Sequence, residues 1–309
     1  MTGPAVRIVM SCMNGAAYLP AQLASIEAQT FSRWSLDVGD DGSVDGTPDI
    51  LRGFNRGRVF EGPQKGVAAA FLTLAERAVA DVPDQALAFC DQDDVWLPEK
   101  LERATEWMMG AGEPERDLLV YASRTVLVDA QLKRIGLSHP HPRPPGFCNA
   151  LVQNVLGGNT IVLSPAAARL LAQSVPAALA AGVPYHDWWA YQILSGAGAT
   201  IFEDPRVGLL YRQHSANQLG HHSPILGRLR RGRMIVGGTY AGWSTANLRA
   251  LNALEGLLTI ENRELLKRFC AARETGGLRF AAALGDLGIY RQNRWSGPPL
   301  RIMAFAGWL

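Results

Sequence analysis

Residues 6–90 alternate between short apolar runs and segments whose apolar residues repeat at helical spacing, and this alternation restricts the fold more than any other feature of the sequence. Strand, helix and strand in succession predict a parallel sheet with helices on both faces. Ligands bind to such sheets beyond the carboxyl ends of the strands. The predicted strands are Val6–Cys12, Trp34–Val38, Arg58–Glu61 and Ala86–Cys90, and the predicted helices between them include Tyr18–Gln29 and Val67–Val79.

Two acidic clusters follow directly after two of these strands. Asp40 and Asp41 come after the second strand, and Asp91, Asp93 and Asp94 come after the fourth. Three carboxylates within four residues repel one another unless a cation compensates them. Mg²⁺ and Mn²⁺ prefer such oxygen ligands, so the second cluster predicts a divalent cation site. The alternative for either cluster is a solvated polar turn ahead of a helix.

After residue 115 the pattern becomes less regular. A strand is expected at Ile161–Leu163, a helix at Pro165–Leu179, and two short strands at Thr200–Phe202 and Val207–Tyr211. The composition turns strongly helical from residue 241 to residue 272, where leucines fall near one stripe. We therefore divide the chain into residues 1–224, with halves of about 1–115 and 116–224, and a helical extension of residues 225–309.

Charge is distributed unevenly between these two parts. Residues 1–224 hold 17 basic and 23 acidic side chains, whereas residues 225–309 hold 13 basic and 5 acidic ones. Basic residues interleaved with apolar ones predict contact with an anionic membrane surface. The alternative is that these arginines pair with acidic residues of residues 1–224 or of a second subunit. Nucleic acid is not among the predicted partners. The densest basic cluster is Arg228, Arg230, Arg231 and Arg233.

The cysteines and the apolar stretches bear on the compartment. The four cysteines are far apart and form no Cys-x-x-Cys pair, which argues against a zinc site and suits a reducing compartment. The N-terminus has no charged start followed by an unbroken apolar run, so no secretory signal is evident. We expect a cytoplasmic protein, attached at most peripherally to the inner face of the membrane.

Five motifs in a fixed order carry a family resemblance. They are Val9-Met10-Ser11-Cys12-Met13-Asn14, Asp40-Asp41-Gly42-Ser43-x-Asp45-Gly46-Thr47, Asp91-Gln92-Asp93-Asp94-Val95-Trp96, His186-Asp187-Trp188-Trp189 and Tyr211-Arg212-Gln213-His214-x-x-Asn217-x-x-Gly220. Together they resemble glycosyltransferase family 2, and the last three match its rhamnosyltransferase-like members. The resemblance implies a GT-A fold, an α/β architecture with a mixed, mostly parallel sheet flanked by helices. Residues 1–224 would then be the catalytic domain, with a nucleotide-binding half and an acceptor half.

The resemblance also implies which positions bind the donor and the metal. Asp93 would bind Mg²⁺ or Mn²⁺, and His214 matches a position that helps to hold the metal or the diphosphate. A structural histidine is the alternative for His214. Lys65 lies in a turn, Gln64-Lys65-Gly66, that departs from the usual Asn-x-Gly of the family. The positions expected to contact the nucleotide sugar are Ser11, Asp40, Asp41, Lys65, Asp91 and Arg212.

The fourth motif implies the base and the acceptor contacts. Asp187 matches the catalytic base of the family, and its alternative role is to cap the helix expected at Trp188–Leu194. The two roles do not exclude each other. Trp188 and Trp189 are candidates for stacking on an acceptor sugar, although packing in the core is expected for at least one of them.

The expected activity is inverting transfer of a sugar from a nucleotide diphosphate to a hydroxyl of a glycan or a lipid-linked acceptor. The subgroup implies dTDP-rhamnose as the donor, and a UDP- or GDP-sugar is the nearest alternative. Two other classes remain: a glycoside hydrolase with Asp93 and Asp187 as its carboxylate pair, and a non-catalytic nucleotide-binding scaffold. A homodimer formed through the C-terminal helices is also expected.

Overall fold

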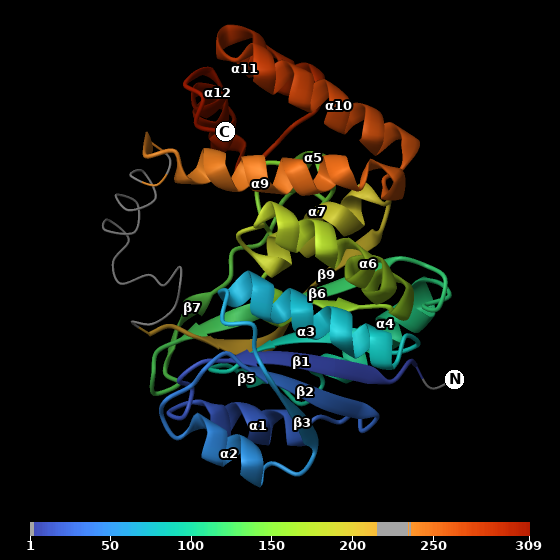
Figure 1. Cartoon of the computed structure of the whole chain (residues 1–309), viewed down its shortest axis with the longest axis vertical. Coiled ribbons are helices and arrows are strands. Elements are labelled where there is room, and N and C mark those ends of the chain that lie inside the picture. The colour runs from blue at the N-terminus through green and yellow to red at the C-terminus, as the bar shows by residue number, and fades with distance from the viewer. Residues whose placement is uncertain (1–2, 215–233, 235) are drawn as a thin grey trace.

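A mixed β-sheet forms the centre of the molecule (Figure 1). The structure, a computed structural model, describes residues 3–214, 234 and 236–309. The strands are β1 Val6–Cys12, β2 Trp34–Asp40, β3 Gly57–Glu61, β4 Ala86–Asp91, β5 Val95–Trp96, β6 Leu119–Val128, β7 Arg134–Leu137, β8 Val162–Leu163 and β9 Thr200–Arg212. Within the described residues their order is β3-β2-β1-β4-β8-β6-β9-β5, and β7 pairs with β6.

The first half of the sheet is parallel and confirms the strands predicted from residues 6–90. β1 pairs in parallel with β2 and with β4, and β2 pairs in parallel with β3. The apolar side chains of β4 alternate between two cores. Leu87 and Phe89 point to one face, and Ala86, Ala88 and Cys90 point to the other. Burial of both faces explains the continuous apolar composition of these strands.

The second half of the sheet mixes parallel and antiparallel pairs. β8 is antiparallel to β4 and to β6, whereas β6 and β9 are parallel. The two strands predicted at 200–202 and 207–211 are instead one strand, β9, so that prediction is wrong. The register of its pairing with β6 shifts between Asp204 and Val207. Pro205 lies between them and has no partner in the ladder. A bulge of this kind accommodates a proline that has no N–H to donate.

Helices cover both faces of the sheet (Figure 1). Helices α1 and α2 lie below the sheet in this view, and α3, α6 and α7 lie above it. The core on the first side includes Leu23 of α1 and Leu101 of α4, and the core on the second side includes Phe71 of α3 and Leu171 of α6. The bounds are α1 Leu19–Glu27, α2 Thr47–Gly53, α3 Val67–Asp81, α4 Lys100–Ala111, α5 Phe147–Ala150, η1 Gly158–Thr160, α6 Pro165–Ala181 and α7 His186–Gly196.

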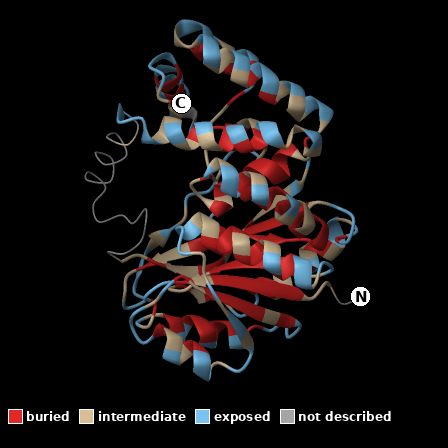
Figure 2. Cartoon of the chain, in the orientation of Figure 1, coloured by how far each residue is buried: buried red, intermediate tan, exposed pale blue. Residues whose placement is uncertain are grey.

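The C-terminal part of the chain is helical, as predicted, and packs onto the second side. Its elements are α9 Thr239–Ala253, η2 Glu255–Leu257, α10 Ile260–Thr275, α11 Gly277–Asp286, η3 Arg294–Ser296 and α12 Gly297–Phe305. Leu251, Phe269 and Phe280 belong to the same core cluster as the residues of α3, α6 and α7. Buried residues therefore continue without interruption from the sheet into these helices (Figure 2).

The basic cluster at 228, 230, 231 and 233 lies outside the described residues, so the structure does not test its role. In the part of the chain that is described, none of the helices is long and apolar enough to cross a membrane.

Candidate functional site

The register of the parallel strands brings the predicted donor-binding residues to one edge of the sheet. Ser11 of β1 lies opposite Gly39 of β2 on one side and opposite Asp91 of β4 on the other. Cys12 lies opposite Asp40. Because these pairs are in register, the carboxyl ends of β1, β2 and β4 stop at one level. Ser11, Asp40 and Asp91 are neighbours for that reason.

The turn after β2 is bonded to the loop after β1 by the residues of the second motif. The Asn14 main-chain N–H donates to Ser43 Oγ at 2.9 Å, and its side-chain Oδ1 accepts from the main-chain N–H of Val44 at 2.9 Å. The main-chain N–H of Gly15 donates to Thr47 Oγ1 at 2.8 Å. These bonds fix two loops that carry few apolar residues, so the motif has a structural role in shaping this end of the sheet.

Gln92 joins the same loop to the metal motif, and sequence reasoning gave it no role. Its amide donates to the main-chain oxygen of Met13 at 3.0 Å and accepts from the Met13 N–H at 3.0 Å. The side chain therefore makes the pair of bonds that an adjacent strand would make. The motif Asp91-Gln92-Asp93-Asp94 contains this residue, but nothing in its spacing distinguishes it from a solvated glutamine.

Asp41 is buried and connects β2 to the turn after β3. Its Oδ1 accepts from the main-chain N–H of Gln64 at 2.6 Å, and its own N–H donates to the main-chain oxygen of Cys12 at 2.8 Å. Gly62 sits close enough that a Cβ there would lie 2.8 Å from the Asp41 Cα. Lys65 is exposed in this turn. Asp41 thus holds together the loops that would line the predicted nucleotide pocket.

The three carboxylates after β4 lie together, as the sequence predicted. Ligand atoms of Asp91, Asp93 and Asp94 all lie within 4.8 Å of one another. Asp94 is fully buried and uses both oxygens, accepting from the Asn159 side-chain amide and from the main-chain N–H of Arg212. Burial, and then the charges of Asp91 and Asp93, raises the pKa of Asp94 well above its usual range. Asp94 therefore anchors the cluster, and Asp91 and Asp93 are left to face a ligand.

His214 follows the last strand of the sheet, β9, and contacts this cluster. β5 pairs with β9 antiparallel, with Val95 opposite Leu210, so the end of β9 lies beside the acidic motif. The His214 Nε2 atom is 2.7 Å from Asp93 Oδ2, and the imidazole stacks on Tyr18 with ring centroids 4.7 Å apart. Two carboxylates and one imidazole are a donor set that fits a divalent cation such as Mn²⁺.

The charge balance of the cluster supports this fit. Burial, and then the charges of Asp93 and Asp187, raises the pKa of Asp91 to about 8 against the opposite effect of Lys100. A carboxyl group with such a pKa holds its proton at neutral pH unless a positive partner compensates the charge. A bound cation would be that partner.

Arg212 is buried beside the cluster, and its contact with the donor stays a prediction. Its guanidinium is buried, donates through Nε to the main-chain oxygen of Asp93 at 2.7 Å, and lies over the Tyr18 ring at 4.7 Å. It also donates to the main-chain oxygen of Ala130 at 2.6 Å. These bonds give Arg212 the role of holding the acidic loop against β9.

Asp187 is brought to the same cluster from the first turn of α7. Its Oδ1 accepts from the main-chain N–H of Trp188 at 2.7 Å, and Oδ2 accepts from the main-chain N–H of Gly158 at 3.2 Å. Its charge is one of those that raise the pKa of Asp91. The N-cap residue is Tyr185 and α7 begins at His186, so Asp187 is the second residue of the helix. The carboxylate is oriented by the main-chain amides of Trp188 and Gly158 near the acidic cluster, and its role as a base stays a prediction.

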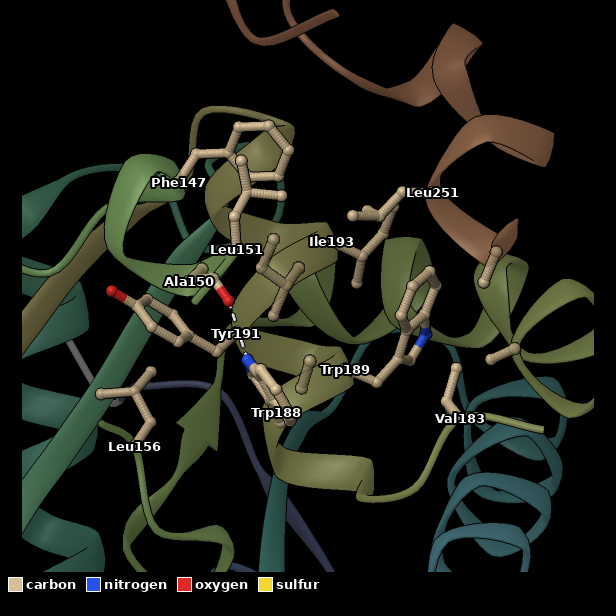
Figure 3. Packing of buried hydrophobic residues seen from close by; sticks show 14 of the residues in the cluster. Phe147, Ala150, Leu151, Leu156, Val183, Trp188, Trp189, Tyr191, Ile193 and Leu251 are labelled. Atoms are coloured by element: carbon tan, nitrogen blue, oxygen red, sulfur yellow. Dashed lines mark hydrogen bonds between the residues drawn. The ribbon is translucent and has the colours of Figure 1, made fainter. Parts of the chain in front are cut away.

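Trp188 and Trp189 do not face an acceptor. They are 3% and 0% exposed and lie in the core between α5, α6 and α7 (Figure 3). The Trp188 indole N–H donates to the main-chain oxygen of Ala150 at 2.8 Å, and that of Trp189 donates to Ser174 Oγ at 2.9 Å. With no ring face open to solvent, neither can stack on a sugar, so the core-packing alternative holds.

Two buried basic side chains behind the site were missed by sequence reasoning. His186 stacks on Phe71 with centroids 4.0 Å apart, and burial lowers its pKa to about 4. Lys100 is fully buried over the Trp96 ring at 3.7 Å, and burial lowers its pKa to about 7 against the attraction of Cys90, Asp94 and Asp91. No described residue accepts a hydrogen bond from the Lys100 ammonium. A lysine that begins a helix carries no sequence signal of burial.

One family model matches part of this chain. The model of glycosyl transferase family 2 matches residues 7–127, which contain β1 to β6 and the acidic clusters. The fifth motif lies outside that match, and its Asn217 and Gly220 also lie outside the described residues.

Several curated bacterial proteins are similar to this chain. A putative teichuronic acid biosynthesis glycosyltransferase, TuaG of Bacillus subtilis, is 32% identical over 34% of this chain and 42% of its own length. The dTDP-rhamnosyl transferase RfbG of Shigella flexneri is 23% identical over 72% of this chain and 77% of its own length. The similarity to TuaG thus spans less than half of that relative's length.

Solved structures confirm the predicted GT-A fold. The mannosyltransferase PcManGT of Pyrobaculum calidifontis, in complex with GDP-Man and Mn²⁺, aligns with 99% of this chain and 86% of its own, at 16% identity and a TM-score of 0.51. Residues 1–349 of TarS of S. aureus, in complex with UDP, align with 85% of this chain and 86% of their own, at 12% identity and a TM-score of 0.50. At these identities the likeness concerns the fold alone.

Proposed function

We propose that this chain is a metal-dependent, inverting glycosyltransferase of family 2 that acts in the synthesis of a bacterial polysaccharide or glycoconjugate. The observation that carries the proposal is the grouping of Asp91, Asp93 and His214 with Asp187 at the carboxyl edge of the sheet. The family match over residues 7–127 and the bacterial relatives support it.

The donor half of the reaction belongs to the edge formed by β1, β2 and β4. Ser11, Asp40 and Asp41 line the side where a base and ribose would bind. Asp91, Asp93 and His214 would hold Mg²⁺ or Mn²⁺ beside the diphosphate. A divalent cation bound there supplies Lewis-acid neutralisation of the charge on the departing diphosphate.

Asp187 acts as the base for the acceptor hydroxyl. Its carboxylate accepts the proton of the acceptor hydroxyl as the hydroxyl oxygen attacks the anomeric carbon from the face opposite the leaving group. The bond from the anomeric carbon to the diphosphate oxygen breaks, so the configuration inverts. The main-chain N–H groups of Trp188 and Gly158 hold the carboxylate in a fixed orientation.

For the donor we propose dTDP-rhamnose, with an L-rhamnoside as the product. The support is the dTDP-rhamnosyl transferase RfbG, whose similarity extends over most of this chain. A UDP- or GDP-sugar is the second candidate, because solved structures of the same fold hold UDP and GDP-Man.

The deciding experiment is a donor screen on the purified protein with Mn²⁺. Melting temperature is measured with dTDP, UDP and GDP, since a nucleotide that binds the folded state raises it. Release of nucleoside diphosphate is then measured with dTDP-rhamnose and with matched UDP- and GDP-sugars. A rise with dTDP alone, together with turnover of dTDP-rhamnose, supports the proposal.

Each other result selects a different function. Stabilisation by UDP or GDP alone assigns the other donor class. Hydrolysis of a glycoside without nucleotide or metal indicates a glycoside hydrolase. Stabilisation by a nucleotide without turnover of any donor, with or without an added acceptor, indicates a binding scaffold.

A further inference from the structure

Four large apolar side chains of α11, η3 and α12 are exposed. Trp295 is 85% exposed, Ile302 is 59% exposed, Phe305 is 55% exposed and Leu278 is 76% exposed. Single exposed apolar residues are normal on a protein surface, but several in one region mark a contact site. We call the surface formed by Leu278, Trp295, Arg301, Ile302 and Phe305 the α11–α12 face.

Helical spacing places the α12 members of this face on one side of their helix. Arg301, Ile302 and Phe305 are related by one, three and four positions, whereas Leu300, Met303 and Ala304 are buried on the opposite side. Trp295 stands in η3, one turn before α12 begins. The apolar stripe therefore runs along the side of α12 that the core does not use.

The exposed side of α11 adjoins this stripe. A Cβ added at Gly285 would lie 3.1 Å from the Arg301 guanidinium, so that guanidinium rests against α11. Leu278 and Gly285 are seven residues apart, which puts them on the same side of that helix. The two helices thus contribute to one surface.

The charge of this region is basic. Residues 277–309 contain four arginines and one acidic residue, Asp286. Arg279 and Arg301 are both exposed beside the apolar members of the face. Tryptophan and arginine around an aliphatic and aromatic stripe are the composition of helices that lie in the interface of a membrane.

We propose that the α11–α12 face docks on an anionic lipid surface, with Trp295, Ile302 and Phe305 entering the headgroup region and Arg279 and Arg301 pairing with lipid phosphates. A second copy of this chain fits less well. A two-fold interface centred on the face would bring Arg301 toward its own copy, and like charges oppose such contact.

This inference extends the proposed function, because a peripheral enzyme on a membrane would meet a lipid-linked acceptor there. One relative, WfgD of Escherichia coli, is named for transfer to a diphosphoundecaprenol-linked sugar, and is 32% identical over 34% of this chain. Docking is measured without turnover, so its failure is distinguishable from failure of the proposed activity.

The test is co-sedimentation of the full chain with phosphatidylcholine vesicles that contain or lack phosphatidylglycerol. We expect binding only with the anionic lipid, weakened by salt. The triple variant Trp295→Ser, Ile302→Ser, Phe305→Ser should bind at least about tenfold more weakly. Arg279→Gln and Arg301→Gln should each weaken binding about fivefold.

Matched controls lie on α10, outside the α11–α12 face. Ile260→Ser removes an apolar side chain that is 80% exposed at the start of α10, and Arg268→Gln removes an exposed arginine of that helix. Both should bind vesicles like the wild type. Quenching of tryptophan fluorescence by brominated lipids should fall in Trp295→Ser, because Trp295 enters the lipid. If another basic region of the chain adsorbed to the vesicles instead, this substitution would leave the quenching unchanged.

Three results would overturn the inference. The first is a wild-type protein that stays in the supernatant with anionic vesicles at low salt. The second is a triple variant that binds like the wild type, since another part of the chain then holds the lipid. The third is a wild-type dimer in sedimentation velocity that the triple variant converts to a monomer, which assigns the face to a subunit interface.

Discussion

At the scale of single residues, the site is a balance of buried charges. Asp91 and Asp94 are held near Asp93, and the buried Lys100 lies behind them with no described acceptor for its ammonium. Each charge is costly to bury alone, and the group is tolerable because the charges compensate one another. A cation bound at Asp91 and Asp93 would complete that compensation.

The raised pKa of Asp91 predicts a pH-dependent stability of the metal-free protein. Its pKa is about 8 in the folded state against an ordinary value of 3.8 for aspartate, so the folded state binds the proton more tightly. The contribution of this proton to the free energy of unfolding is fully present below about pH 4 and is lost as the pH rises toward about 8. In EDTA, the melting temperature of the wild type should fall over this range relative to that of Asp91→Asn. Excess Mn²⁺ should stabilise the wild type more at pH 8 than at pH 6, and equal stabilisation would contradict this.

Asp93→Asn tests the metal site directly. Because Asp93 contacts His214 and faces the ligand side of the cluster, its loss should abolish both Mn²⁺-dependent binding of the nucleotide and turnover. Asp49→Asn, an exposed acid on α2, is the control and should behave like the wild type. Calorimetry with and without Mn²⁺ measures the first effect. Full activity of the wild type in excess EDTA would remove the metal from the mechanism.

Asp187→Asn should separate catalysis from binding. The amide keeps the shape of the side chain but cannot take a proton, so turnover should fall about 10²–10⁴-fold while the affinity for the nucleotide changes little. Calorimetry and a turnover assay on the same preparation check both parts. Poor nucleotide binding, or normal turnover, would assign Asp187 to holding the start of α7.

At the scale of elements, the acidic loop depends on the pairing of β5 with β9. Asp94 is the link, because its carboxylate accepts from Asn159 and from the main-chain N–H of Arg212 at the end of β9. Arg212 in turn donates to the main chain of Asp93. The metal-facing residues are therefore positioned by a strand more than a hundred residues away in sequence.

Asp94→Asn should destabilise the fold. The asparagine amide would place an N–H₂ group against one of the two donors that Asp94 now satisfies, leaving a buried polar group without a partner. The expected loss is about 1–3 kcal/mol in the free energy of unfolding. Urea denaturation measures it, with Asp49→Asn, at an exposed position, as the control. A variant as stable as the wild type would show that the loop does not need this link.

At the scale of the whole molecule, the C-terminal helices share a core with the sheet. Leu251 of α9 and Phe269 of α10 belong to the same cluster as Phe89 of β4. Because residues 1–224 and residues 225–309 share this core, we expect the two parts to unfold together.

Leu251→Ala examines this coupling. The substitution should lower the free energy of unfolding by about 2–5 kcal/mol, because the side chain is fully buried and leaves a cavity. A single transition should persist, shifted to lower temperature, by both circular dichroism and calorimetry. Ile260→Ala, at an exposed position, should leave it unchanged. A second transition that shifts alone would show that the extension folds independently.

The sequence by itself determined the features that depend on near neighbours in the chain. Apolar runs and helical spacing in residues 6–90 identify β1 to β4, α1 and α3, because these patterns report burial within a few residues. The positions of Asp40, Asp91 and Asp93 at strand ends follow from those boundaries. The parallel order of the strands then places the three carboxylates at one edge.

The tertiary structure decided what depends on contacts between distant segments. The course of β6 and β9 is set by their mutual pairing and by a bulge at Pro205, which no local pattern announces. Trp188 is covered by α5, and Lys100 lies beneath the acidic cluster, because burial is a property of what packs around a side chain. Composition shows that a tryptophan is apolar and a lysine basic, and only the packed fold determines whether either meets a ligand.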